Sequence, residues 1–219
     1  MGGTKGWSRV SGVTCLRWLV FVLFFVSAAT GCAWETGSNP DAGDLDGTNG
    51  GDQDDGYPPG PYGTDYGDTI ENFQIVKVLC AGSEGTGRNL QLKELLGAKS
   101  VLLTVHSGSC YYCREQAKDM EELYQRYKDQ GLDILLVLIS DERGSSDRDN
   151  LLDFGCSYIN DYGMTFTVAV DPGFVAMEPL LREGTPLNIL LDDQMVIRYR
   201  VEALMPETLE GNIQHMLEE

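Results

Sequence analysis

Two cysteines, Cys110 and Cys113, stand where an apolar run meets a helical pattern. The run before them, Ser100–His106 (SVLLTVH), consists mostly of Leu and β-branched residues, which is typical of a strand buried on both faces. After them, residues 111–129 carry apolar side chains along one stripe, and Gly131 is a helix stop. A buried strand that enters a helix through a CxxC motif predicts an α/β domain with reactive thiols at the junction.

The place of the motif at a helix start gives the two thiols different roles. The first turn of a helix stabilises negative charge, because its backbone N–H groups have no partner within the helix. We therefore predict that Cys110 attacks as a thiolate and that Cys113, one turn later, resolves the mixed disulfide. A zinc site would need two more ligands, but the sequence has no second CxxC and its two His are isolated. A purely structural disulfide would close too short a loop to contribute much stability, so the prediction is a redox dithiol with no metal and no cofactor.

The rest of residues 70–219 alternates strand and helix patterns. Strands are predicted at residues 73–79, 132–139, 166–170, 187–191 and 195–201, and helices at 90–96, from Ser146 or Asp147 to 161, and from Pro206 onwards. A tight turn at 192–194 joins the last two strands, so one edge of the sheet is antiparallel. This order predicts one α/β domain with a central mixed sheet flanked by helices.

Several of these features together resemble the thioredoxin superfamily, and within it the TlpA/ResA-like thiol–disulfide oxidoreductases of the AhpC/TSA-redoxin type. The features are the strand VLLTVH, the motif CYYC, Arg114 directly after it, and Glu183-Gly184-Thr185-Pro186 before the strand at 187–191. The resemblance implies a thioredoxin-like fold and disulfide exchange with protein clients through Cys110 and Cys113. It also implies that Pro186 is cis and packs against the disulfide, while the backbone of Thr185 pairs with the substrate.

Four positions depart from the family pattern. Ser109 replaces the Trp before the first Cys, and His106 replaces another aromatic residue. Thr104 stands where thioredoxin has a buried Asp that takes protons, and Lys118 replaces a Pro in the helix. For His106 two interpretations stay open, a proton acceptor or a packed, hydrogen-bonded side chain. The departures leave the fold and the dithiol prediction intact, but they give no direction of electron flow and no client.

The dipeptide between the two cysteines, Tyr111-Tyr112, lies where a substrate must approach. Its rings are predicted either to contact the substrate or to shield the buried sulfur. We include both tyrosines among the substrate-binding residues, together with Thr185 and Pro186.

Two other functions are compatible with such a domain. A peroxiredoxin-like peroxidase resembles PxxxTxxC, but Leu103 and Ser107 occupy the Pro and Thr positions here, and a resolving Cys so close by is atypical. A tethered binding module that has lost its redox role is compatible with the missing Trp and Asp. A copper chaperone is disfavoured, because its ligands resemble CxxxC with a distal His, whereas His215 lies in the predicted terminal helix.

Two further cysteines, Cys80 and Cys156, are left over in the domain. In an oxidising compartment an exposed lone thiol is a hazard, which favours a second disulfide between them. Cysteine also packs well as a small apolar side chain, so two separately buried thiols are the alternative. The sequence does not decide between the two arrangements.

The chain begins with the pattern of a secretory signal. Residues 1–31 contain basic residues and no acid, and an apolar run from Trp18 to Ala29 ends in small residues. Ala29-Thr30-Gly31-Cys32 resembles the lipobox of bacterial lipoproteins, in which the Cys is acylated and becomes the mature N-terminus. By the same resemblance, Ala33 points to the outer membrane. The alternatives are an ordinary signal-peptidase site near residues 28–31, and a buried helix or short anchor.

Residues 32–69 are predicted to be a disordered tether. Acidic residues and Gly are frequent there, and Lys and Arg are absent, so the segment buries too little apolar surface to fold. Asp44-Leu45-Asp46-Gly47 resembles part of a calcium loop, but Ala42 stands at the first ligand position and no bidentate Glu follows. A calcium site is therefore not predicted.

The net charge and the length of the apolar runs exclude some classes of protein and partner. With 34 acidic against 16 basic residues and a net charge of −18, it is a poor candidate for binding nucleic acid. No apolar run reaches the ~18 residues needed to span a bilayer, which excludes a polytopic membrane protein. The expectation is a lipid-anchored protein of the bacterial cell envelope, on the periplasmic side of the outer membrane. Its partners would be protein thiol or disulfide clients and an envelope electron donor or acceptor.

Overall fold

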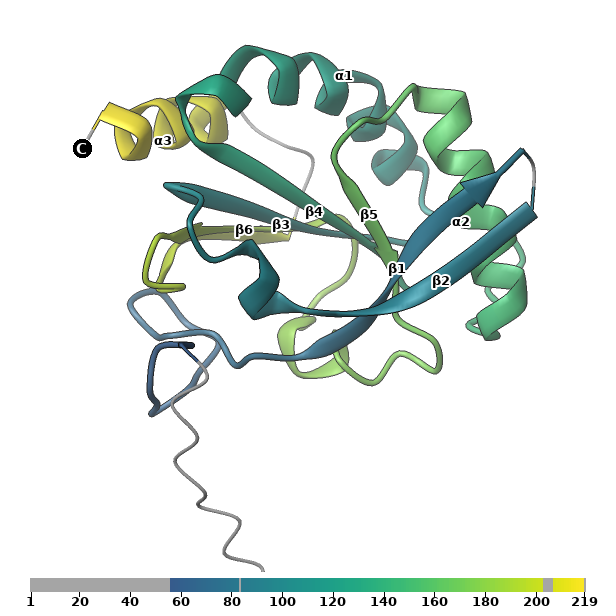
Figure 1. The fold of residues 1–219 in the computed structure, drawn as a ribbon, viewed down its shortest axis with the longest axis horizontal. Coiled ribbons are helices and arrows are strands. Elements are labelled where there is room, and N and C mark those ends of the chain that lie inside the picture. Colours follow the sequence, from purple (N-terminus) through teal and green to yellow (C-terminus); the bar gives the residue numbers. More distant parts are fainter. Residues whose placement is uncertain (1–55, 83, 203–206, 219) are drawn as a thin grey trace, which may run out of the picture. The chain divides into compact units, whose positions relative to one another are not determined.

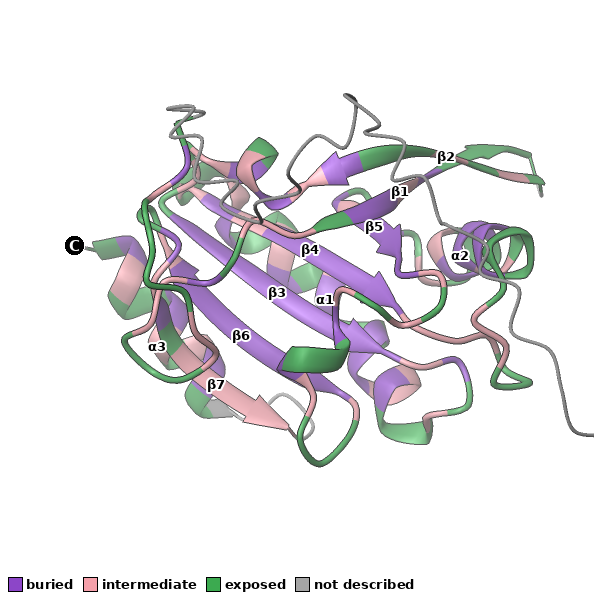
Figure 2. Cartoon of the chain, turned by 90° about the horizontal axis from the view of Figure 1, so that it is seen from below, coloured by how far each residue is buried: buried purple, intermediate pink, exposed green. Residues whose placement is uncertain are grey.

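The computed structural model describes residues 56–82, 84–202 and 207–218. The predicted signal peptide, Cys32 and the linker up to residue 55 lie outside these ranges, as does Pro206. The described part forms a seven-stranded mixed sheet in the order β2-β1-β5-β4-β3-β6-β7 (Figures 1 and 2). The strands are β1 (Gln74–Ala81), β2 (Glu84–Gln91), β3 (Ser100–His106), β4 (Leu132–Leu138), β5 (Thr167–Val170), β6 (Leu187–Asp192) and β7 (Ile197–Glu202).

Three α-helices and three short 3-10 helices accompany the sheet in the ranges given above. The α-helices are α1 (Tyr111–Tyr127), α2 (Arg148–Tyr162) and α3 (Glu207–Glu218), and the 3-10 helices are η1 (Leu92–Leu95), η2 (Lys128–Gln130) and η3 (Glu178–Leu180). Asp147 caps α2 by accepting the N–H groups of Asp149 and Asn150, as one of the two predicted caps. The predicted mixed sheet flanked by helices is confirmed.

The position of β3 inside the sheet explains why its sequence is continuously apolar. It pairs in parallel with β4 and antiparallel with β6, and every one of its residues is buried (Figure 2). Alternate side chains enter two separate cores: Leu102 joins the core beneath α1, α2 and α3, whereas Leu103 and Val105 join the core on the opposite face. That second core is closed by η1, η3 and the segment that precedes β1. A strand that is covered on both faces does not need alternating polar and apolar residues.

Strand β2 is the one strand of the described residues that the sequence pattern missed. Its residues are mostly polar and include Gly85 and Gly87, which are poor strand formers. The strand forms because it pairs along its whole length with β1 and lies close to α2. A Cβ on Gly85 would lie 2.1 Å from the carbonyl oxygen of Leu152, so only glycine fits there. The predicted helix at 90–96 is therefore wrong at its start, because Leu90 belongs to β2 and only η1 remains.

The ordered domain begins before the predicted boundary at Ile70. The hydroxyl of Tyr57 donates to the carbonyl oxygen of Ile70 over 2.8 Å, and Thr69 forms a β-bridge with Val196. Tyr57 and Ile70 are both buried in the core opposite the α-helices. Tyr57 and Thr69, which lie in the range predicted to be a linker, thus contact the folded domain.

A disulfide joins Cys80 in β1 to Cys156 in α2, with their Cα atoms 5.5 Å apart. Of the two arrangements left open for these cysteines, the structure contains the bridged one. Within the ranges that the structure describes, no helix is long and apolar enough to cross a membrane.

Candidate active site

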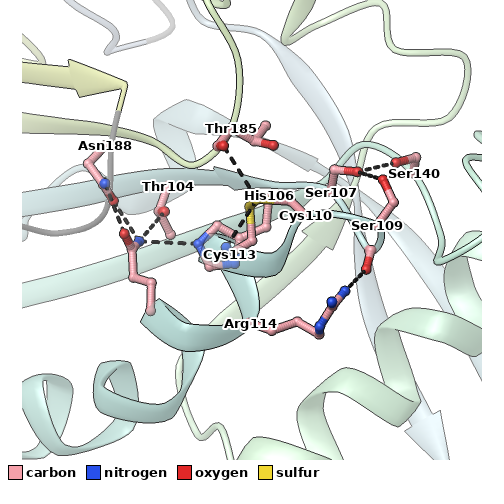
Figure 3. The surroundings of a disulfide bond; sticks show 12 residues. Thr104, His106, Ser107, Ser109, Cys110, Cys113, Arg114, Ser140, Thr185 and Asn188 are labelled. Carbon is pink, nitrogen blue, oxygen red and sulfur yellow. Dashed lines mark hydrogen bonds between the residues drawn. A yellow bond between two sulfur atoms is a disulfide. The ribbon is translucent and has the colours of Figure 1, made fainter.

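The cysteines of the CxxC motif lie at the carboxyl end of β3, where α1 begins. They form a disulfide, and their Cα atoms are 5.3 Å apart (Figure 3). Cys110 is the N-cap of α1, and its Sγ accepts the backbone N–H of Cys113 over 3.0 Å. Cys110 is half-buried, whereas Cys113 is fully buried. The first cysteine is therefore partly accessible to solvent, and the second is not.

Tight packing holds the turn between β3 and Cys110. A Cβ on Gly108 would lie 2.5 Å from the backbone of Asp141, so the turn sits directly against the loop after β4. The Ser107 hydroxyl lies 2.7 Å from that of Ser140 and 3.1 Å from that of Ser109. Arg114 donates from Nη1 to the carbonyl oxygen of Gly108 over 2.6 Å. Ser109, which replaces the family's Trp, thus joins a hydroxyl cluster beside the disulfide.

A second loop, which leads into β6, lies beside the disulfide. The peptide bond between Thr185 and Pro186 is cis, and Pro186 is buried. The carbonyl oxygen of Thr185 lies 3.3 Å from Sγ of Cys110, although the two residues are far apart in the sequence (Figure 3). They meet because β6 runs antiparallel to β3, with Leu187 opposite Val105.

Beneath the motif, His106 is the centre of a buried polar group. Its Nδ1 lies 3.0 Å from the hydroxyl of Tyr158, and its Nε2 lies 3.2 Å from Nε2 of Gln116. Burial lowers the pKa of His106 to about 3, so the imidazole is neutral at physiological pH. The contacts fit a ring protonated on Nδ1: Gln116 donates to Nε2, Nδ1–H donates to Tyr158, and Tyr158 donates to the carbonyl oxygen of Cys113 over 3.3 Å. This geometry matches the packed, hydrogen-bonded interpretation of His106.

Gln116 and Asn188 complete the group and were not predicted. Their side-chain amides pair with each other over 2.8 and 3.1 Å, and Nε2 of Gln116 also lies 3.1 Å from Oγ1 of Thr104. Each had a weak sequence signal. Gln116 is polar on the buried stripe of α1, and Asn188 interrupts the apolar run of β6. Where thioredoxin has a buried carboxylate, this group consists of neutral side chains.

Tyr111 and Tyr112 lie on the surface at the start of α1. Their side chains are 61% and 56% exposed, and their rings meet edge to face with centroids 5.6 Å apart. Rings so exposed contribute little to covering Cys113. They offer an apolar surface directly beside Cys110.

The structure therefore gathers most of the predicted site residues. Cys110, Cys113, Thr185 and Pro186 meet where β3 ends and β6 begins, with the two tyrosines beside them. Cys80 and Cys156 form a separate bridge between β1 and α2. In the described ranges, no group of three or more His, Cys, Asp or Glu side chains could hold a metal ion.

Comparison with protein families gives a match to the AhpC/TSA family over residues 66–200. The chain belongs to this family. The "Thiol-disulfide oxidoreductase ResA" proteins of Bacillus thuringiensis strain Al Hakam and of Bacillus anthracis are each 30% identical to it over 126 residues. Each of these matches covers 57% of this chain and 67% of the relative.

Solved structures give the same fold. A putative thiol:disulfide interchange protein DsbE from Chlorobium tepidum superposes with a TM-score of 0.57 at 22% identity, covering 71% of this AhpC/TSA chain and 99% of that protein. The thioredoxin domain of a thiol–disulfide oxidoreductase from Bacteroides vulgatus gives a TM-score of 0.56 at 18% identity, with coverage of 71% and 99%. The thioredoxin-like fold implied by the sequence resemblance is confirmed.

Proposed function

We propose that this AhpC/TSA-family protein is a thiol–disulfide oxidoreductase that exchanges electrons with protein clients through Cys110 and Cys113. The observation that carries the proposal is the position of Cys110. Cys110 is half-buried at a helix start, and its sulfur lies within 3.3 Å of the backbone of a cis-proline loop. The relatives named thiol–disulfide oxidoreductases support the same activity.

Cys110 is the attacking thiol in this proposal. Its sulfur accepts the N–H of Cys113 and lies at the positive end of the α1 dipole, and both features stabilise a thiolate. The thiolate attacks a client disulfide, an S–S bond forms between client and Cys110, and the other client sulfur leaves as a thiolate. Cys113 then attacks Sγ of Cys110, releases the second client thiolate and closes the disulfide of this protein. The client gains two electrons, and the reverse sequence oxidises a client dithiol.

The burial of Cys113 keeps the second step intramolecular. Its sulfur is inaccessible to a second client, but it lies one helical turn from Cys110. His106 is a poor proton acceptor at neutral pH because its pKa is about 3. We assign it a positioning role, in which it and Tyr158 hold the backbone at Cys113.

The client side of the site is the cis-proline loop and the two exposed tyrosines. An extended client segment would pair with the backbone of Thr185, with its sulfur directed at Cys110. Tyr111 and Tyr112 would contact apolar side chains on either side of the client cysteine.

We further propose that the protein works in the bacterial cell envelope, anchored by lipid at Cys32 on the periplasmic side of the outer membrane. The lipobox-like segment supports the anchor. The Cys80–Cys156 disulfide supports an oxidising compartment. An envelope electron donor or acceptor would then restore the dithiol or disulfide after each turnover.

Two single-cysteine variants test the assigned roles. Cys110→Ser should abolish insulin reduction with dithiothreitol and capture no client, because the remaining sulfur is buried. Cys113→Ser should still attack and then stall, so mixed disulfides that dissolve in reducing agent accumulate on non-reducing gels of envelope extracts. Adducts with Cys110→Ser but not with Cys113→Ser would reverse the roles. No adducts with either variant, together with no insulin reduction by the wild type, would favour a redox-inactive binding module.

A further inference from the structure

Glu202, at the end of β7, binds the loop that leads into the cis-proline bond. Its carboxylate accepts the backbone N–H groups of three consecutive residues: Arg182 over 3.1 Å, Glu183, and Gly184 over 2.8 Å. Burial raises the pKa of Glu202, but these three N–H groups and a neighbouring arginine outweigh it, and the pKa lies below its usual range. The group is therefore a carboxylate at neutral pH.

Arg200 completes the attachment from the same strand. It pairs with Glu202, and its Nη2 donates to the carbonyl oxygen of Leu180. The side chains of Arg200 and Glu202 are only 11% and 7% exposed, so water screens the pair weakly. Two side chains of β7 thus hold the backbone at residues 180 and 182–184.

The held segment ends one residue before the redox site. Gly184 is followed by Thr185, whose carbonyl oxygen lies 3.3 Å from Sγ of Cys110, and then by the cis bond to Pro186. A shift of the backbone at Gly184 would move Thr185 against the disulfide. A displacement of about 1 Å in a reacting geometry costs up to ~100-fold in rate.

We propose that Glu202 is a positioning residue of the redox site, which fixes the backbone of residues 182–184 so that Thr185 can pair with an extended client peptide beside Cys110. This inference rests on the proposed function, since it assigns Glu202 to the client-binding half of the reaction. Glu202 touches neither client nor sulfur and acts only through the loop.

The same hairpin provides a matched control. At the opposite end of β6, Asp192 accepts the N–H groups of Gln194 and Val196 over 2.9 Å each, and it pairs with Arg198 over 2.7 Å. The chemistry resembles that at Glu202: one carboxylate accepts backbone N–H groups of a loop and pairs with one arginine of β7. Asp192, however, lies at the far end of the strand from Leu187, which follows the cis-proline bond. Asp192→Asn therefore reports the loss of a loop-binding carboxylate without a change at the redox site.

The experiment compares two substrates on the full-length wild type, Glu202→Gln, Glu202→Asp and Asp192→Asn. The first substrate is a peptide disulfide, which needs the backbone of Thr185. The second is dithiothreitol, which reduces the Cys110–Cys113 bond and needs only access to the sulfur. Glu202→Gln should lower kcat/KM for the peptide by about ten- to a hundredfold and leave the dithiothreitol rate nearly unchanged. Glu202→Asp keeps the charge on a shorter stem and should recover part of the loss.

Two results would overturn the inference. One is an equal loss with both substrates, which a general loss of structure would produce. The other is a loss in Asp192→Asn as large as in Glu202→Gln. If Glu202→Gln does not fold, Glu202→Asp takes its place, since a shorter carboxylate cannot reach all three N–H groups.

Amide hydrogen exchange separates this inference from the proposed function. If the wild type reacts with dithiothreitol but with no peptide disulfide, the proposed function fails. The positioning of the loop is then judged by exchange at residues 182–184. Faster exchange there in Glu202→Gln than in Asp192→Asn supports it, and equal exchange overturns it.

Discussion

Reduction of the Cys80–Cys156 disulfide should lower the free energy of unfolding by about 4.5 kcal/mol at 25 °C. The bond joins residues 76 positions apart, and its Cα–Cα distance of 5.5 Å is that of an ordinary disulfide. In the chain-entropy relation, a closed loop of this length removes about 15 cal/mol/K from the unfolded ensemble, which gives this free energy. The Cys110–Cys113 bond spans only three positions and contributes far less by the same relation.

The measurement uses Cys110→Ser/Cys113→Ser, so that the Cys80–Cys156 bond alone responds to a reducing agent. Urea unfolding followed by far-ultraviolet circular dichroism gives the free energy with the bond intact and after its reduction, which alkylation and mass analysis verify. For a domain of this size, the loss corresponds to a fall of roughly 9–18 °C in Tm.

A single substitution checks the origin of the effect. Cys80 is exposed and Cys156 is fully buried, so Cys80→Ala removes the bond with little loss of packing. Under oxidising conditions Cys80→Ala should be as stable as the reduced protein. A difference below about 1 kcal/mol between the oxidised and reduced protein would refute the argument from loop length.

Three other outcomes are expected. The pKa of His106 in the folded protein is about 3, below its unfolded value, so stability should fall as pH drops from about 6.5 towards 3, by up to about 1.4 kcal/mol per pH unit. The free energy of unfolding of His106→Gln, measured across that pH range, should depend less steeply on pH than that of the wild type. The same slope in both proteins would contradict a buried neutral ring. Gly85→Ala should cost about 1–3 kcal/mol in urea unfolding, because its Cβ would overlap the Leu152 carbonyl. Gly211→Ala in α3 meets open space and should stabilise by up to ~1 kcal/mol in the same measurement. Cys32→Ser should move the protein from the membrane fraction to the soluble fraction, and retention with unprocessed Met1 by mass would end the anchor proposal.

Much of the fold could be predicted because its signals are local. The run SVLLTVH, the stripe along α1, the Asp147 cap and the tight turn before β7 each depend on neighbours in the sequence. The CxxC motif belongs to the same class, since its chemistry follows from the start of one helix. Strand β2 could not be found this way, because its glycines and polar residues acquire strand structure only by pairing with β1 and lying against α2.

The environment of the motif was decided by the tertiary structure. Cys110 and Thr185 are 75 positions apart in the sequence, and they meet because β6 lies antiparallel to β3. No local pattern specifies that register. The same pairing places Asn188 beside Thr104 and allows Gln116 of α1 to bind both. Burial then keeps His106 neutral, although the residue type alone left a proton acceptor open.

The sequence by itself determined that this protein carries a CxxC motif at the start of a helix on an α/β domain, because helix start, strand burial and thiol spacing are properties of adjacent residues. The tertiary structure alone decided which surfaces adjoin that dithiol, that Cys80 pairs with Cys156, and that Glu202 binds the loop before Thr185. These contacts join residues far apart in the chain. Their geometry depends on how the strands pair and how the helices pack, which is a property of the whole fold.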